Sequence, residues 1–225
     1  VLFSSSLFFY ACGEPKYVFV MLLNIIVNYL MALLINKLRE KSILSKIFFI
    51  LDICFNVGML GYFKYANFFI ENFVALTGLS MPLLNIALPI GISFYTFQIL
   101  SYVIDVYKGR VKVQKNLLTL GTYIVLFPQL IAGPIVRYSD VEEQLSNREH
   151  TFDKFAEGIK RFIFGLSKKI LIANVLGELC ATFQTTNDKT ILFYWLFAVA
   201  YTLQIYFDFS GYSDMAIGLG KMFGF

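Results

Sequence analysis

The sequence has too few charged residues to cover a soluble domain. Only 15% of its 225 residues are Asp, Glu, Lys or Arg, whereas 58% are hydrophobic and the mean hydropathy is +0.68. Soluble globular domains have about 25% charged and about 45–50% apolar residues. A soluble chain of this length would need more polar surface around its core, so the composition predicts an integral membrane protein.

Histidine and cysteine are also scarce. His150 is the single histidine and stands in a polar loop, where such a residue is usually solvated and has no positioned partner for general-base catalysis. Cys12, Cys54 and Cys180 are far apart in apolar surroundings and lack metal-ligand spacing. Neither a metal site nor a nucleophile motif of the soluble enzymes is therefore expected.

Basic residues gather in short polar loops, two of which are 36–46 and 105–115. This distribution is typical of the cytoplasmic loops of a polytopic membrane protein, and it offers no recurring basic face for nucleic acid. The chain begins within a hydrophobic run without a charged leader and stops without a polar tail. We therefore expect a truncated portion of a longer protein, not a signal peptide.

Apolar segments of spanning length predict an all-α bundle of five to seven helices that cross the membrane or embed in it. Membrane spans are expected at 17–35, 47–63 and 191–209, with an interrupted apolar segment at 83–106. The chain, residues 1–225, is expected to form a single membrane domain.

Three further segments lack the pattern of a plain span. Residues 64–76 are short and polar, which favours an interfacial helix. Residues 155–183 alternate apolar and basic positions, which predicts an amphipathic helix at the interface. Prolines at 128 and 134 predict a broken, re-entrant segment around 127–129, although a plain short span is the alternative.

Polar residues within the apolar segments carry the chemical signal. Asn24 and Asn28 are four residues apart, as are Asp52 and Asn56, so each pair shares a helix face. An ionisable group at membrane depth is a functional candidate, and a pair that holds the bundle together by hydrogen bonds is an equal alternative.

The segment YFDFSGYSDMAIG, residues 206–218, places Asp208 and Asp214 in apolar sequence. These two residues are about 240° apart on a straight helix, so a break at Gly211, with Ser213 as the next N-cap, is expected to bring them together. The alternatives are carboxylates that cap helix ends and tie the bundle, or carboxylates that line a transporter.

Five longer stretches occur in collinear order from residue 60 to the end. They are LGYFKYANFF (60–69), LPIGISFYTFQILSYVIDVYKG (88–109), FPQLIAGPIVRYSD (127–140), HTFDKFAEGIKRFIFGLSKK (150–169) and QIYFDFSGYSDMAIGLGKMFGF (204–225). Together these stretches resemble the membrane-bound O-acyltransferase (MBOAT) family, and in particular its members that acetylate alginate. The first 50 residues match that family in hydropathy only.

The resemblance implies helices around a tunnel through the bacterial inner membrane, in a multi-pass protein. It implies transfer of an acyl group, expected to be acetyl, from a cytoplasmic thioester towards hydroxyls of an extracytoplasmic polysaccharide, by way of a partner protein that accepts the group. The donor would be acetyl-CoA or an acyl-carrier thioester, used as a substrate and not as a bound cofactor. Alginate, another exopolysaccharide, cellulose and a cell-wall polymer remain open as acceptors.

The resemblance also implies that the essential histidine lies downstream of Phe225 and that the family's first helix is missing. No catalytic residue is expected within the chain, which should be inactive alone. The residues expected to form or support the tunnel wall are Gln98, Gln129, Gln204, Asp208, Ser210, Tyr212 and Asp214.

Charge alone suggests Arg137, Lys168 and Lys169 as residues that face an anionic donor. Two other functions compete with the acyltransferase. One is a transporter or flippase, suggested by broken helices and carboxylates at membrane depth. The other is a purely structural membrane subunit, in which the aspartates affect stability alone.

Overall fold

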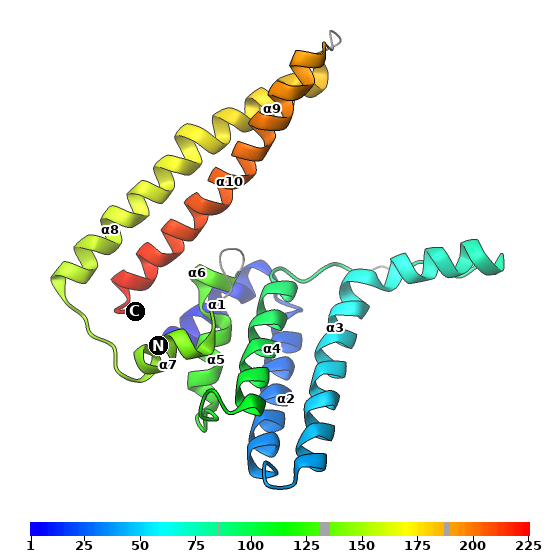
Figure 1. Cartoon of the computed structure of the whole chain (residues 1–225), viewed down its shortest axis with the longest axis vertical. Helices are drawn as coiled ribbons and strands as arrows, with labels where there is room; N and C mark the ends of the chain where they lie inside the picture. The colour runs from blue at the N-terminus through cyan, green and yellow to red at the C-terminus, as the bar shows by residue number, and fades with distance from the viewer. Residues whose placement is uncertain (85, 131–135, 187–189) are drawn as a thin grey trace. The chain divides into compact units, whose positions relative to one another are not determined.

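The computed structural model describes residues 1–84, 86–130, 136–186 and 190–225, apart from the side chains of Gln129 and Ser146. These ranges consist of helices and the loops that join them (Figure 1). No strand occurs in these ranges, which confirms the predicted all-α class. The described residues up to Glu142 form one compact unit, and those from Glu143 form a second.

The first unit contains most of the helices. They are α1 (Leu2–Gly13), α2 (Val18–Lys37), α3 (Ser42–Thr77), α4 (Ile92–Lys108), α5 (Leu117–Val125), α6 (Phe127–Leu130) and the start of α7 (Tyr138–Ser146). Helices α2, α3 and α4 pack against one another, and α5 packs against α1, α2 and α4 (Figure 1). The buried side chains include four tyrosines with no exposed surface, Tyr95, Tyr102, Tyr123 and Tyr138.

Helix α3 joins two segments that the sequence analysis separates. The predicted span at 47–63 and the predicted interfacial helix at 64–76 form one continuous helix, which bends sharply along its length (Figure 1). No residue between 64 and 77 interrupts the backbone hydrogen bonds, so the helix ends only at Gly78, in the left-handed conformation with φ 69°. Residues 64–76 are therefore helical, as predicted, but they continue the helix of the preceding span, and their place at the membrane interface stays a prediction.

The interrupted segment at 83–106 becomes helical only from Ile92 onward, as α4. Gly91 precedes it with φ 74°, and a Cβ atom at this position would lie 2.5 Å from the backbone oxygen of Leu130. Only glycine therefore fits where α4 begins. The predicted break near Pro128 is confirmed as the change of direction at Leu126 between α5 and α6. The predicted break at 133–134 lies outside the described residues.

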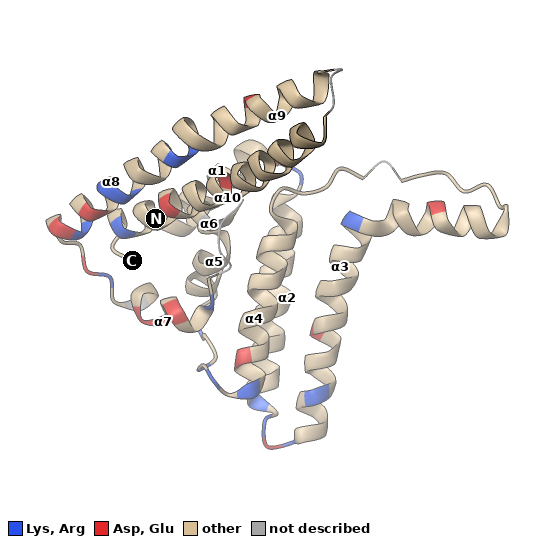
Figure 2. Cartoon of the chain, turned by 45° about the horizontal axis from the view of Figure 1, so that its top comes forward, with Lys and Arg blue, Asp and Glu red and all other residues tan. Residues whose placement is uncertain are grey.

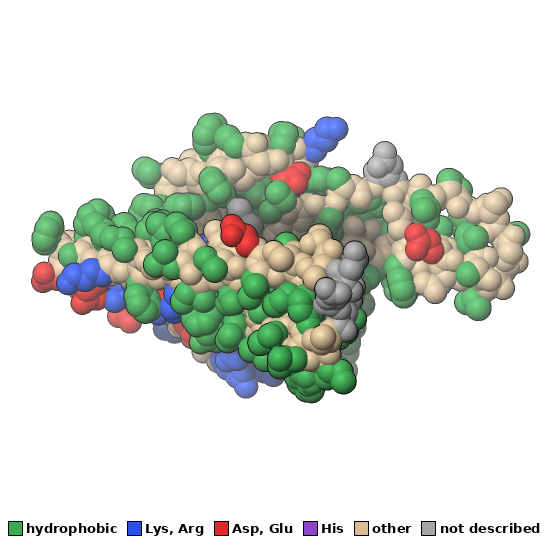
Figure 3. All heavy atoms as spheres, turned by 90° about the horizontal axis from the view of Figure 1, so that it is seen from above, with side chains coloured by type: hydrophobic (Ala, Val, Ile, Leu, Met, Phe, Trp, Pro, Cys, Tyr) green, Lys and Arg blue, Asp and Glu red, His purple; other side chains and the backbone are tan. Residues whose placement is uncertain are grey.

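Within the described ranges, α2, α3 and α10 (Ile191–Met222) are long and apolar enough to cross a membrane. Their exposed side chains include many large hydrophobic residues, among them Phe19, Phe68 and Trp195. In the view of Figure 3, hydrophobic side chains are spread over the surface and charged side chains occupy a few places. An apolar surface of this kind is suited to contact with lipid.

The second unit is a helical hairpin. Helix α8 (Phe152–Ser167) continues through the π-helix η1 (Lys168–Asn174) into α9 (Val175–Thr185), and α10 runs back along all three (Figure 1). The long amphipathic helix predicted at 155–183 is confirmed. The Thr151 side chain caps α8 by accepting from the Lys154 amide, and Thr190 caps α10 by accepting from the Phe193 amide.

Helix α10 is continuous through Gly211, so the predicted break at that residue is wrong. Ser213 is not an N-cap, because its hydroxyl donates within the helix to the Phe209 carbonyl oxygen at 2.9 Å. Gly211 is buried against α8, so its small size serves helix packing and not a change of direction.

Candidate functional site

Helices α8 and α10 are in closest contact along a line of four glycines. These are Gly158 and Gly165 on α8, and Gly211 and Gly218 on α10. The two members on each helix are seven residues apart, so they share a face. A Cβ atom on Gly158 would lie 2.7 Å from the Gly218 oxygen, and one on Gly165 would lie 2.5 Å from the Gly211 oxygen. The two backbones therefore approach more closely than other residues allow.

Asp214 on α10 binds two cations from the opposite arm of the helical hairpin, one on α8 and one on η1. Its Oδ1 atom lies 3.1 Å from Arg161 Nε, and its Oδ2 atom lies 2.6 Å from Lys168 Nζ. Lys168 Nζ also donates to the Ser210 hydroxyl oxygen at 3.0 Å. The side chains of Asp214 and Lys168 are only 15% and 20% exposed, so this cluster is largely removed from solvent.

Asp208 forms a separate ion pair with Lys169, and this pair is about half exposed. The carboxylates of Asp208 and Asp214 lie on opposite flanks of Gly211, as their spacing on a continuous helix requires. The backbone of Lys168 and Lys169 lies against Gly211, so these consecutive lysines reach the two flanks. The structure thus gives each aspartate its own cation and does not bring the two aspartates together.

A further ion pair lies near the C-terminal end of α10. Lys221 Nζ is 2.5 Å from Glu157 Oε2, and the hydrogen bond and charge of Lys221 hold the pKa of Glu157 below its usual value. With the pairs of Asp214 and Asp208, charged contacts occur at three levels along α8, η1 and α10. The aspartates that look isolated in the sequence are therefore paired with cations from about 40 to 50 residues upstream.

This cluster is suited to holding helices in register, and it lacks the features of a catalytic acid–base pair. Each lysine is engaged in an ion pair with an aspartate, so neither side chain of the pair is positioned as a general acid or base toward a substrate. Ser210 accepts a hydrogen bond from Lys168, and no base among the described residues contacts its hydroxyl to activate it. His150 is exposed in the loop before α8, as predicted, and its ring lies beside Gly224.

Gln98, another predicted tunnel residue, lies in the first unit. Its Nε2 atom donates to the Tyr123 carbonyl oxygen at 2.8 Å, and the Tyr123 hydroxyl donates to the Val136 carbonyl oxygen at 2.8 Å. The rings of Tyr102 and Tyr138 stack edge to face beside them, with centroids 4.9 Å apart. Gln98 therefore joins α4 to α5 within a buried group of tyrosines.

The other predicted residues are dispersed. The Gln204 side chain packs over Gly177 of α9, where a Cβ atom would lie 3.1 Å from its amide nitrogen. Tyr212 is partly exposed on α10, and the Gln129 side chain lies outside the described part of the structure. Arg137 is exposed in the first unit, whereas Lys168 and Lys169 belong to the second and bind the aspartates.

Arg161, the second cation on Asp214, has no signal in the sequence, because its partner is 53 residues away. The buried polar pairs of α2 and α3 are predicted by their spacing. Asn56 Nδ2 donates to Asn28 Oδ1 at 2.7 Å, and Asn24 Nδ2 donates to Asn56 Oδ1 at 3.1 Å. Asp52 accepts from Asn56 at 3.3 Å, and all four side chains are fully buried. The interhelical hydrogen-bonding alternative is therefore confirmed for these residues.

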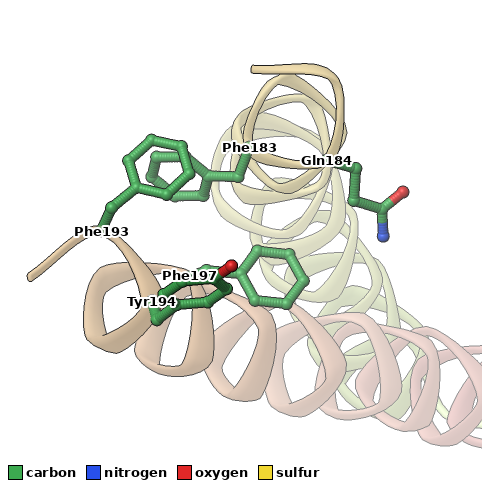
Figure 4. Close-up of a pocket in the computed structure, with 5 residues that line it drawn as sticks. All are labelled: Phe183, Gln184, Phe193, Tyr194 and Phe197. Atoms are coloured by element: carbon green, nitrogen blue, oxygen red, sulfur yellow. The ribbon is translucent and has the colours of Figure 1, made fainter. Parts of the chain in front are cut away.

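A small pocket of about 110 Å³ lies where α9 meets the start of α10, lined by Phe183, Gln184, Phe193, Tyr194 and Phe197 (Figure 4). Phe183 and Phe193 meet edge to face with ring centroids 4.5 Å apart, and Gln184 points away from these two rings (Figure 4). Ligand pockets usually measure about 300–1,000 Å³, so this space fits a gap between aromatic side chains and not a substrate site.

Comparison with known proteins relates the chain to one family. The model of the membrane-bound O-acyltransferase family matches residues 111–225, which include α5, Tyr123 and Tyr138 of the tyrosine group, and the described residues of the second unit. The ion-paired helices α8 and α10 therefore lie within the segment that this family shares.

Curated relatives agree with that match. The chain is 43% identical over its whole length to the probable alginate O-acetylase AlgI of Pseudomonas aeruginosa, and 33% identical over 97% of its length to the peptidoglycan O-acetyltransferase of Helicobacter pylori. It is also 27% identical over 60% of its length to the teichoic acid D-alanyltransferase of Bacillus subtilis. The chain spans 44%, 47% and 35% of these relatives, respectively.

Proposed function

The chain belongs to the membrane-bound O-acyltransferase family, and on this premise we propose that it serves the transfer of an acyl group, expected to be acetyl, to hydroxyls of an extracytoplasmic polysaccharide such as alginate. The observation that carries the proposal is the 43% identity, over the whole chain, to a probable alginate O-acetylase. The bacterial inner membrane is the proposed location, because three helices in the described part of the chain are long and apolar enough to span and the proposed polysaccharide lies outside the cell.

The proposed reaction is acyl transfer from a thioester. An acceptor hydroxyl oxygen attacks the carbonyl carbon, the C–O bond forms, the C–S bond breaks, and the hydroxyl proton passes through a general base to the leaving thiolate. The proposed donor is acetyl-CoA or an acyl-carrier thioester, and a partner protein outside the membrane passes the group to the polysaccharide. Hydrogen-bond donors that stabilise the oxyanion would lower the barrier further.

We assign the residues of this chain to support and not to catalysis. The ion pairs of Asp208 and Asp214 fix η1 and α8 against α10, and the proposed tunnel is shaped by this rigid wall. The proposed general base is a histidine beyond Phe225, which agrees with the exposed loop position of His150. The carboxylates that suggested a transporter are neutralised by lysine and arginine, which weakens that alternative.

Arg137 is the remaining candidate for the donor side, because Lys168 and Lys169 already bind carboxylates. An exposed guanidinium can bind a phosphate with two parallel hydrogen bonds. In the complete protein, Arg137→Ala should weaken binding of acetyl-CoA without altering the unfolding temperature. Unchanged donor binding would remove Arg137 from the site.

The function is tested with the complete protein in proteoliposomes, supplied with a radiolabelled acetyl donor on the cytoplasmic side, and with alginate and a periplasmic extract that provides the partner protein on the other. We expect label in alkali-labile esters on the polysaccharide. Peptidoglycan and teichoic acid in place of alginate test the acceptor. Labelling of neither polymer nor protein, by folded protein, would contradict the proposal. Transport of the intact donor without esterification would favour a transporter.

A further inference from the structure

A basic pocket of about 480 Å³ lies in the first unit, where α2 ends and the loop after α4 begins. Its lining residues are Asn36, Arg39, Gly109, Arg110, Val111, Lys112, Val113 and Lys115. Four of these residues carry a positive charge and none carries a negative one. Figure 2 shows Lys and Arg gathered at this end of the unit, where α2 and α4 finish and α3 begins.

One wall of the basic pocket depends on Gly109. This residue ends α4 with φ 71°, and a Cβ atom on it would overlap the guanidinium group of Arg39. Glycine therefore serves two purposes here, because it adopts the left-handed conformation and leaves room for Arg39. The arginine is thereby brought from the end of α2 onto the loop that carries the other cations.

The opposite wall is an irregular loop that hydrogen bonds hold in place. The Tyr29 hydroxyl donates to the Lys115 carbonyl oxygen at 2.7 Å. The Gln114 amide donates to the Tyr102 hydroxyl at 2.9 Å, and the Gln114 side chain donates to the Tyr138 hydroxyl at 2.9 Å. Tyr102 and Tyr138 are fully buried, so the loop is anchored to the core and the pocket exists before any ligand binds.

The charge of the basic pocket is largely uncompensated. Arg110 lies 3.5 Å from Asp105, whereas no ion pair involves Arg39, Lys112 or Lys115 among the residues that the structure describes. Glu40 follows Arg39 but does not line the pocket. A polar space with this excess of cations favours an anion with several acceptor oxygens, such as a phosphate group.

The depth of the basic pocket favours a lipid as the source of that phosphate. Helix α2 is long and apolar enough to cross the membrane and ends at Lys37, so Asn36 and Arg39 lie where a span meets the headgroup layer. Basic pockets between helices at this level bind anionic headgroups. We propose that the basic pocket binds the phosphate-bearing headgroup of an anionic phospholipid, a site independent of the proposed acyl transfer.

The test uses the complete protein in nanodiscs that contain phosphatidylcholine and phosphatidylglycerol, with bound lipids counted by native mass spectrometry. We expect retention of phosphatidylglycerol over phosphatidylcholine. Arg39→Gln and Lys112→Gln should each lower the apparent affinity for phosphatidylglycerol about fivefold, from the contribution of one cation near an anionic surface. Lys46→Gln is the matched control, because Lys46 is an exposed cation near the start of α3 that does not line the pocket.

Equal losses in the Lys46→Gln control and the two pocket variants would overturn the proposal, because they would show a general surface potential. Inorganic phosphate provides the second arm. Failure of inorganic phosphate to displace the lipid supports a headgroup site. The opposite result is that inorganic phosphate displaces the lipid at the same concentration at which it binds the lipid-free protein. That result would overturn the proposal, because the site would then select a free anion. All three substitutions are of exposed side chains, so folded protein is expected in each case.

Discussion

Gly165 and Gly211 lie with their backbones in contact, so that a Cβ atom on Gly165 would stand 2.5 Å from the Gly211 oxygen and one on Gly211 would stand 2.8 Å from the Gly165 oxygen. The obstacles are backbone atoms, which cannot turn aside as a long side chain can. The α8–α10 hairpin therefore tolerates no added methyl group at this contact without a shift of one helix.

The substitution Gly165→Ala should thus destabilise the protein by about 1–3 kcal/mol, as overpacking of a well-packed interface does. The measurement is unfolding of the purified protein in mixed micelles, followed by circular dichroism. Gly61→Ala is the matched control, because nothing lies within 4 Å of a Cβ atom at that position of α3. The control should leave stability unchanged or raise it by up to about 1 kcal/mol, since alanine is the better helix former. Equal effects of the two substitutions would contradict the close contact.

Asp214 should contribute more to stability than Asp208. Asp214 is 15% exposed and binds both Arg161 and Lys168, whereas Asp208 is 49% exposed and has Lys169 as its one ion-pair partner among the described residues. Asp214→Asn leaves two cations without a carboxylate in a partly buried site, and we expect a loss of about 2 kcal/mol. Asp208→Asn should cost less than about 1 kcal/mol, because solvent screens that pair.

The same two variants separate a supporting role from catalysis. If the aspartates support the proposed tunnel wall, Asp208→Asn should change the transfer activity per folded molecule only little. Asp214→Asn should lower that activity, because the helices lose their register. The double variant Lys169→Asp with Asp208→Lys exchanges the two charges, and it should restore the stability and activity that the single substitutions lose. A loss of activity that exchange does not restore, in a protein of normal stability, would indicate a direct part in the reaction.

The buried amide group between α2 and α3 should be sensitive to loss of Asn56. Asn56→Leu removes hydrogen bonds to Asn28, Asn24 and Asp52 and leaves these groups buried, which costs about 1–3 kcal/mol. The matched control is Asn72→Leu on the same helix, because Asn72 is exposed and donates only to the Phe68 carbonyl oxygen of its own helix. Thermal unfolding of both variants provides the comparison, and a control as damaging as Asn56→Leu would refute the assignment.

Acid should weaken the link between Glu157 and Lys221. Because the pKa of Glu157 is lower in the folded protein than in the unfolded chain, its contribution is present above the unfolded value and disappears as the pH falls through the folded one. We expect a small stability difference between the wild type and Glu157→Gln near neutral pH, which vanishes below about pH 4. The pH dependence of the unfolding temperature of both proteins measures it. A difference that grows in acid would have the wrong sign.

Patterns within one helix were sufficient to predict much of this fold. The apolar length of residues 17–35, the amphipathic pattern of residues 155–183 and the shared face of Asp52 and Asn56 depend on neighbours in sequence, and the structure confirms a helix in the first two and a hydrogen bond in the third. Ser210 and Asp214, four residues apart, likewise contact the same lysine. These features follow from helix geometry alone.

Relations between helices could not be predicted in the same way. Gly211 looks like a helix break when α10 is considered alone, and only the opposing Gly165 shows that it is a packing contact. The partners of Asp208 and Asp214 are 39 to 53 residues away, so the aspartates seem unpaired in sequence. Charge alone suggests an anionic donor as the partner of Lys168 and Lys169, because the sequence does not show that Asp214 and Asp208 lie beside them.

The ion pairs of the second unit have a consequence for the order in which the protein is made. Arg161, Lys168 and Lys169 leave the ribosome before Asp208 and Asp214, so these three cations lack the carboxylates that bind them in the folded hairpin until α10 follows. A charge at the centre of a bilayer costs at least about 2.5–3.5 kcal/mol, which disfavours early burial of α8 and η1. Integration of this hairpin should therefore be a concerted event, timed by the synthesis of α10.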